Sequence, residues 1–157
     1  MDRSARWVLL AYRLPREPST PRITLWRKLR RLGAVQILDG LVGLPLDART
    51  REQFEWLADE VLEAGGEASL WLGSPAGAAQ ERTLIGSMNA ELDAEYRALI
   101  AAARAAATEP VSSRRRTLGR LRREFRRIAA RDYFPAPGQA AARDAVEALA
   151  VEIEVRR

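Results

Sequence analysis

Nine arginines lie between Arg114 and Arg131, and their type and spacing make them the residues of this 157-residue sequence best suited to binding chemistry. The same stretch holds one acidic residue, Glu124, so its net charge is +8, whereas the whole chain carries +5. The remainder of the chain is therefore net acidic. Arginine presents planar, permanently charged donors that suit phosphate and other oxyanions. The sequence thus predicts an anionic partner rather than covalent catalysis.

The arginine-rich stretch also predicts an amphipathic helix at about residues 112-131, which Ser112 or Ser113 can cap. Its apolar positions recur at intervals of three and four and would dock the helix on the rest of the protein: Leu118, Leu121, Phe125 and Ile128. The arginines then form a presented surface.

We expect the contact with DNA or another anion at six positions of this helix: Arg115, Arg116, Arg122, Arg123, Arg126 and Arg127. A competing interpretation is a solvated helix face that acidic residues of the preceding helix partly neutralise, namely Glu91, Asp93 and Glu95.

Strand and helix patterns alternate through the first half of the chain. The apolar run at residues 6-14 predicts a strand buried on both faces. A helix follows Pro21, with an apolar stripe of Ile23, Trp26, Leu29 and Leu32. Asp39-Gly40 favours a type I′ hairpin, in which both residues have positive φ. Thr50 and Gln53 then form a capping box ahead of a second helix, and a strand at residues 68-72 completes the pattern.

This order predicts an α+β protein. It consists of a ferredoxin-like β-α-β-β-α-β unit at residues 1-74, followed by a helical extension at residues 75-157 packed on it. A last helix runs to Ala150, and residues 151-155 fit either a strand or the end of that helix. All four tryptophans, Trp7, Trp26, Trp56 and Trp71, fall in the first unit, where aromatic area is typical of a core or an interface.

Composition excludes several classes of protein. The chain has no cysteine and no histidine, which removes disulfides, thiol nucleophiles, the usual zinc sites and imidazole proton transfer. No signal peptide or membrane-spanning stretch is recognisable, so we expect a cytoplasmic protein without a membrane partner. No nucleotide-binding glycine motif is present, and we expect no cofactor and no metal.

Five strings together carry a family resemblance: Trp7-Val8-Leu9-Leu10, Leu14-Pro15-Arg16-Glu17-Pro18-Ser19, Trp26-Arg27-Lys28-Leu29-Arg30-Arg31-Leu32-Gly33-Ala34, Thr50-Arg51-Glu52-Gln53-Phe54 and Arg131-Asp132-Tyr133-Phe134-Pro135. They are similar to the N-terminal domain of ChrB-type chromate-resistance regulatory proteins. The resemblance implies a regulatory module of chromate resistance. Longer members of that family are chromate-responsive transcriptional regulators of a chromate efflux gene, and they carry a further C-terminal domain.

Residues and resemblance together predict a non-enzymatic regulatory module that contacts DNA phosphates through the helix from Arg114 to Arg131. One alternative is a sensor that holds chromate, sulfate or another oxyanion at Arg13, Arg16 and Arg27. Another is an interaction domain that forms a homodimer or binds a separate C-terminal regulator domain. The most remote alternative is a metal-dependent nuclease, which would need an acid where Tyr12 and Arg13 end the first strand.

Overall fold

The computed structural model describes residues 6–155, which form two compact units that divide after Met88. The first unit contains, in chain order, β1 (Trp7–Arg13), α1 (Thr20–Leu32), β2 (Val35–Leu38), β3 (Leu41–Pro45), α2 (Ala48–Glu63) and β4 (Glu67–Gly73). The helix α3 (Ala78–Ala106) begins in the first unit and ends in the second, which also holds α4 (Val111–Ala129) and α5 (Gln139–Val155). The protein is therefore of mixed α/β type, and its chain order is the one predicted.

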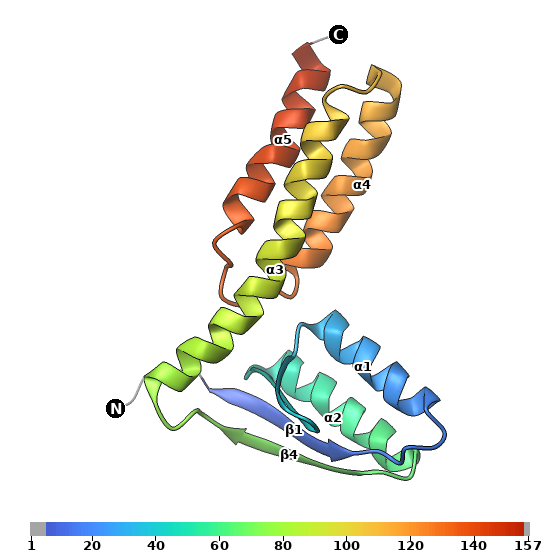
Figure 1. Ribbon diagram of the computed structural model, residues 1–157, viewed down its shortest axis with the longest axis vertical. Coiled ribbons are helices and arrows are strands. Elements are labelled where there is room, and N and C mark those ends of the chain that lie inside the picture. The colour runs from blue at the N-terminus through green and yellow to red at the C-terminus, as the bar shows by residue number, and fades with distance from the viewer. Residues whose placement is uncertain (1–5, 156–157) are drawn as a thin grey trace. The chain divides into compact units, whose positions relative to one another are not determined.

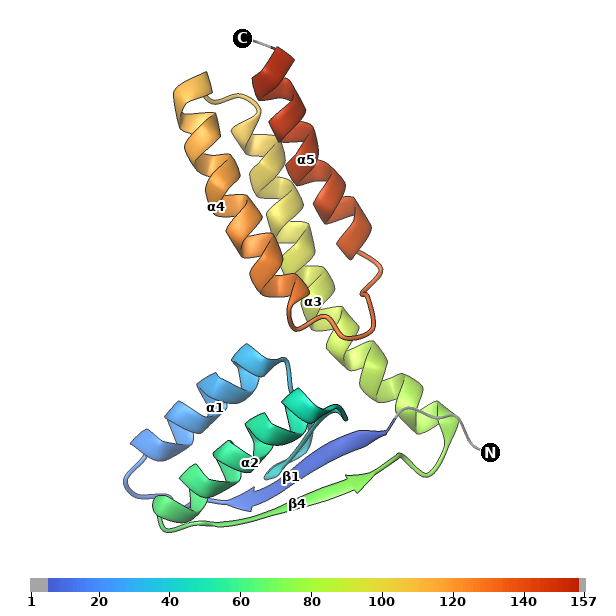
Figure 2. The same cartoon turned by 180° about the vertical axis from the view of Figure 1, so that it is seen from behind.

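The four strands of the first unit form one antiparallel sheet in the order β2-β3-β1-β4. Helices α1 and α2 cover one face of this sheet in both views (Figures 1 and 2). Val8 and Leu10 of β1 point to that face and are fully buried. On the opposite face Trp7 is buried as well, but Trp71 is 61% exposed. The second face is thus covered only in part.

The buried side of α1 differs from the predicted stripe. Leu25 and Leu29 are buried, whereas Ile23 and Trp26 are exposed. Residues 25, 29 and 32 are spaced by three and four, as are the predicted residues 23, 26, 29 and 32. The sequence alone therefore does not decide which of these two neighbouring stripes is buried. Of the four tryptophans, predicted to belong to a core or an interface, Trp7 lies in the core. Trp26, Trp56 and Trp71 are 54%, 60% and 61% exposed, so for them only the interface stays as a prediction.

Three local predictions need correction. Asp47, not Thr50, is the N-cap of α2, and it exchanges hydrogen bonds with Thr50 in a capping box. Helix α4 begins at Val111 after Pro110, and Ser113 instead donates its hydroxyl to the Pro110 carbonyl. At the hairpin only Gly40 has a positive φ, 76°, so the turn is not of type I′.

The second unit has its own hydrophobic core, built by three helices that lie side by side (Figures 1 and 2). Each helix contributes a stripe at intervals of three and four: Leu92, Tyr96 and Leu99 from α3, Leu118, Leu121, the partly buried Phe125 and Ile128 from α4, and Val146, Leu149 and Ile153 from α5. Because α5 continues to Val155 and buries Ile153, residues 151-155 are helical. The packing of residues 75-157 on residues 1-74 stays a prediction.

A hydrogen-bonded network fixes the turn between α4 and α5. The Asp132 carboxylate accepts the Tyr96 hydroxyl at 2.8 Å, the Ala136 backbone N–H at 2.9 Å and the Gln139 side-chain amide at 3.0 Å. The Gly138 N–H donates to Asp93 at 2.7 Å. Gln139 also donates to the Tyr96 hydroxyl at 3.3 Å, so Asp132 joins α3, the turn and α5 in one network that stabilises the return of the chain into α5.

Replacing Asp132 with alanine should lower the free energy of unfolding of the second unit by about 2–3 kcal/mol, because three donors lose their acceptor. Urea unfolding followed by circular dichroism measures the loss. The matched control is Asp144→Ala on the exposed side of α5, which should change stability by less than about 0.5 kcal/mol. Equal effects of the two variants would contradict the assigned role of Asp132.

The pKa of Tyr96 is raised from 10.0 to about 12, chiefly because burial disfavours the phenolate and further because of the neighbouring Asp132 carboxylate. The unfolded chain releases this proton first as the pH rises. Tyr96 therefore contributes stability that is complete below pH 10 and is lost between pH 10 and 12. Wild type should lose stability faster than Tyr96→Phe in this window, by up to about 1.4 kcal/mol per pH unit. Urea midpoints that run parallel would contradict it.

Candidate anion-binding surfaces

The helix α4 carries a core stripe and an arginine row on opposite sides. Each member of the arginine row, Arg116, Arg120, Arg123 and Arg127, lies two positions after a residue of the inward side, Arg114, Leu118, Leu121 and Phe125. Two positions are about 200° of helical rotation, so the row faces away from the core. All four side chains are exposed, and the row extends over about 16 Å of helix.

Three other arginines of the predicted surface are engaged. Arg114 is only 3% exposed, and its Nε donates to the Glu109 carbonyl at 2.7 Å, so it belongs to the interior and not to the surface. Arg122 forms an ion pair with Glu147 at 3.2 Å. Arg131 binds both oxygens of Glu95, and this hydrogen bond raises the pKa of Arg131.

Acidic residues of α3 therefore neutralise only part of the arginine-rich stretch. Of the three acids expected to do it, Glu95 pairs with Arg131, and Asp93 accepts the Gly138 N–H. Within residues 6–155 the arginine row makes no ion pair with a carboxylate. Arg115 and Arg126, which flank the row, are likewise exposed and make none within the described chain.

A groove lies between α4 and α5 beside this row. It is lined by Arg122, Phe125, Arg126 and Arg143, with Val146 and Glu147. The Arg143 guanidinium lies over the Phe125 ring, 5.5 Å from its centroid, in a cation–π contact that orients its charge. Arginines of α4 and α5 thus form one basic region, in which Arg120 and Arg143 were not singled out from the sequence. Arg120 could have been found by its position two residues after Leu118.

A second basic surface lies in the first unit. The predicted oxyanion residues Arg13, Arg16 and Arg27 line one open basin of about 1000 Å³, which we call the first-unit basin. Arg22, absent from the predicted set, lines it as well, together with Tyr12, Trp26, Gln36 and Asp39. Arg13 pairs with Glu67 at 2.9 Å, while within residues 6–155 the other three arginines make no ion pair.

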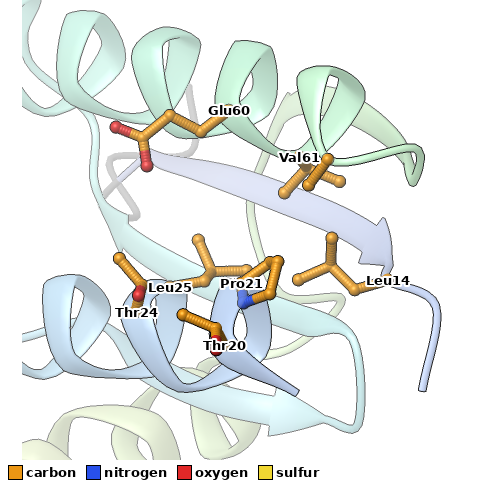
Figure 3. Close-up of a pocket in the computed structure, with 8 residues that line it drawn as sticks. Leu14, Thr20, Pro21, Thr24, Leu25, Glu60 and Val61 are labelled. Carbon is orange, nitrogen blue, oxygen red and sulfur yellow. The ribbon is translucent and has the colours of Figure 1, made fainter. Parts of the chain in front are cut away.

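The pocket between α1 and α2 has the opposite character (Figure 3). Its volume is about 240 Å³, and its lining includes Leu14, Pro21, Leu25 and Val61. Of the eight lining residues only Glu60 is charged, and its carboxylate accepts from Lys28 at 2.6 Å. A mostly apolar pocket whose lining carries no cation does not suit an oxyanion.

Acidic side chains that could serve a nuclease do not converge on one site. Asp47 caps α2, Asp39 accepts the Gln36 amide, and Glu60 pairs with Lys28. Across residues 6–155 no group of three acidic, histidine or cysteine side chains is placed to hold a metal ion. Over the same residues, no helix combines the length and the apolarity needed to cross a membrane.

A family model described as "Protein ChrB, N-terminal" matches residues 22–155. The chain belongs to this family. The family associates the chain with the regulation of chromate resistance, and it is not a known enzyme family. Neither a curated protein nor a solved structure matches the chain significantly.

Chemical modification should separate the two classes of arginine in this ChrB-family chain. Phenylglyoxal should modify Arg116 and Arg123 readily, because both guanidinium groups are exposed and unpaired within the described residues. Arg114 and Arg131 should react slowly, because one is buried and the other is bound to Glu95. Mass spectrometry of peptides at increasing reaction times measures the order. Early modification of Arg114 would contradict the orientation of α4.

Proposed function

We propose that the chain is a non-enzymatic regulatory module that contacts DNA phosphates through the arginine row, in transcriptional control of a chromate efflux gene. The observation that carries the proposal is the row itself, with four exposed arginines on one side of α4 and no carboxylate paired with them in residues 6–155. Such a role would place the chain in the cytoplasm.

The row is not explained by the stability of the helix. Arg116 and Arg120 lie four residues apart, as do Arg123 and Arg127. Like charges at this spacing destabilise a helix by about 0.2–0.5 kcal/mol per pair. A partner that neutralises the charges relieves this repulsion when it binds, which favours a phosphate backbone over a purely solvated face.

Contacts of this kind would anchor the protein without reading a sequence. A guanidinium group can donate two parallel hydrogen bonds to a phosphate. Such contacts fix the position and orientation of a protein on a duplex. Gly119 supports a close approach, since its position lies between Arg115 and Arg123 on the outward side of α4. An added Cβ there would meet only the Arg123 guanidinium, at 3.5 Å, so packing does not require glycine.

The strand order and the two helices on one face support assigning the first unit to the ferredoxin-like type. In that unit the first-unit basin supports the alternative of an oxyanion sensor, because it gathers Arg13, Arg16 and Arg27. A small tetrahedral anion fits this basin less well, because the basin is large and open and because Arg13 is already paired with Glu67. Calorimetry with chromate and with sulfate tests this alternative.

Changing Arg116, Arg120, Arg123 and Arg127 together to glutamine should weaken binding to duplex DNA at least about tenfold at 0.1 M salt. It should also make the slope of log K against log salt shallower by about 3.6, if each arginine neutralises one phosphate. Fluorescence anisotropy with a labelled duplex over a salt series measures both. Because like-charge repulsion is removed, the variant should be as stable as wild type or more so.

The matched control changes Arg49, Arg82, Arg97 and Arg104 to glutamine. These arginines are exposed, make no ion pair in residues 6–155, and give the same change in net charge. The control should bind nearly as wild type does. Equal losses in the two variants would show that only net charge matters, and absence of duplex binding by wild type at low salt would remove the proposal.

A further inference from the structure

The first-unit basin combines cations with an exposed aromatic ring. Arg16, Arg22 and Arg27 line it and are exposed, and within residues 6–155 none of them pairs with a carboxylate. Trp26 lines the same basin and is 54% exposed. Leu25 and Leu29 are the residues of α1 that enter the core of this unit, so packing does not explain an exposed tryptophan among arginines.

Trp26 is held in place by its neighbour on α1. The Arg30 guanidinium lies over the ring, 5.0 Å from its centroid, one helical turn further along. Arg30 is not among the residues that line the basin. The indole is therefore oriented by a cation and still presents surface to the basin, where a flat ligand can stack.

The volume of the basin sets the size of its ligand. At about 1000 Å³ it is at the upper end of ligand sites, and it is open to solvent. A single tetrahedral anion would leave most of it filled with water and would not use Trp26. A ligand that carries several anionic groups and flat aromatic rings uses all of these features, and a nucleic acid strand has that chemistry.

We propose that the first-unit basin binds single-stranded nucleic acid, with an unpaired base stacked on Trp26 and backbone phosphates bound by Arg16, Arg22 and Arg27. Bases in a duplex are stacked on each other, so an indole at the protein surface can stack only on an unpaired base. Gln36 and Asp39, whose side chains are hydrogen-bonded at 3.3 Å, lie in the same lining and offer polar groups to a base edge.

This site is separate from the contact proposed for α4. It uses other residues, in the other compact unit, and another form of nucleic acid. Loss of one activity therefore leaves the other measurable in the same 157-residue chain.

Trp26→Ala tests the stacking, and Trp56→Ala is its matched control, because Trp56 is 60% exposed and does not line the basin. The probe is a labelled oligothymidylate of about twelve nucleotides, within the range of known single-strand sites. Fluorescence anisotropy at low salt should show affinity lowered about tenfold or more for Trp26→Ala and nearly unchanged for Trp56→Ala. Duplex binding should be the same in both variants.

An oligomer of the same length with abasic sites separates stacking from charge. It should bind wild type and Trp26→Ala equally, since it has phosphates but no bases. The double variant Arg22→Gln with Arg27→Gln should make the salt dependence shallower by about 1.4 in slope, against no change for Arg49→Gln with Arg82→Gln. The proposal is overturned if wild type does not bind the oligothymidylate, if Trp26→Ala binds it as wild type does, or if the abasic strand shows the same loss.

Discussion

The Asp132 carboxylate is the interaction on which the arrangement of the second unit depends. It accepts hydrogen bonds from Tyr96 in α3, from Ala136 in the turn and from Gln139 in the first turn of α5. Arg131, the preceding residue, is fixed separately by Glu95. These contacts hold the end of α4 at a defined place against α3. A helix with so many like charges would otherwise gain little from folding, because its apolar side is narrow.

One side of α4 packs in the core, and the other side presents the arginine row. Leu118, Leu121 and Ile128 supply the buried area that keeps the helix in the bundle, and the buried stem of Arg114 extends that side by one turn. The opposite side contributes nothing to this packing and costs stability through repulsion. The residues of α4 that stabilise the fold are therefore different from those proposed to bind. A change to the arginine row leaves the core intact.

Periodicity predicted the elements well but not which neighbouring residues face inward. The core stripe of α4 follows from the sequence, because no second apolar stripe competes in that helix. In α1 two stripes were available, and only packing on the sheet selects Leu25 over Trp26. Asp47 was missed as a cap because Thr50 offered an equally good local pattern. The first-unit basin was foreseen in part, since Arg22 joins Arg13 and Arg16 only after the chain folds.

The scarcity of lysine has a consequence for how these surfaces behave. Lys28 is the single lysine of the chain, and its ammonium group is paired with Glu60. The cations of both basic surfaces are therefore guanidinium groups, whose charge is permanent, and the chain has no histidine. Their charge is the same in mildly acidic and mildly alkaline surroundings, and lysine acetylation cannot change it. Competing anions and the salt concentration, in contrast, do change what such surfaces bind.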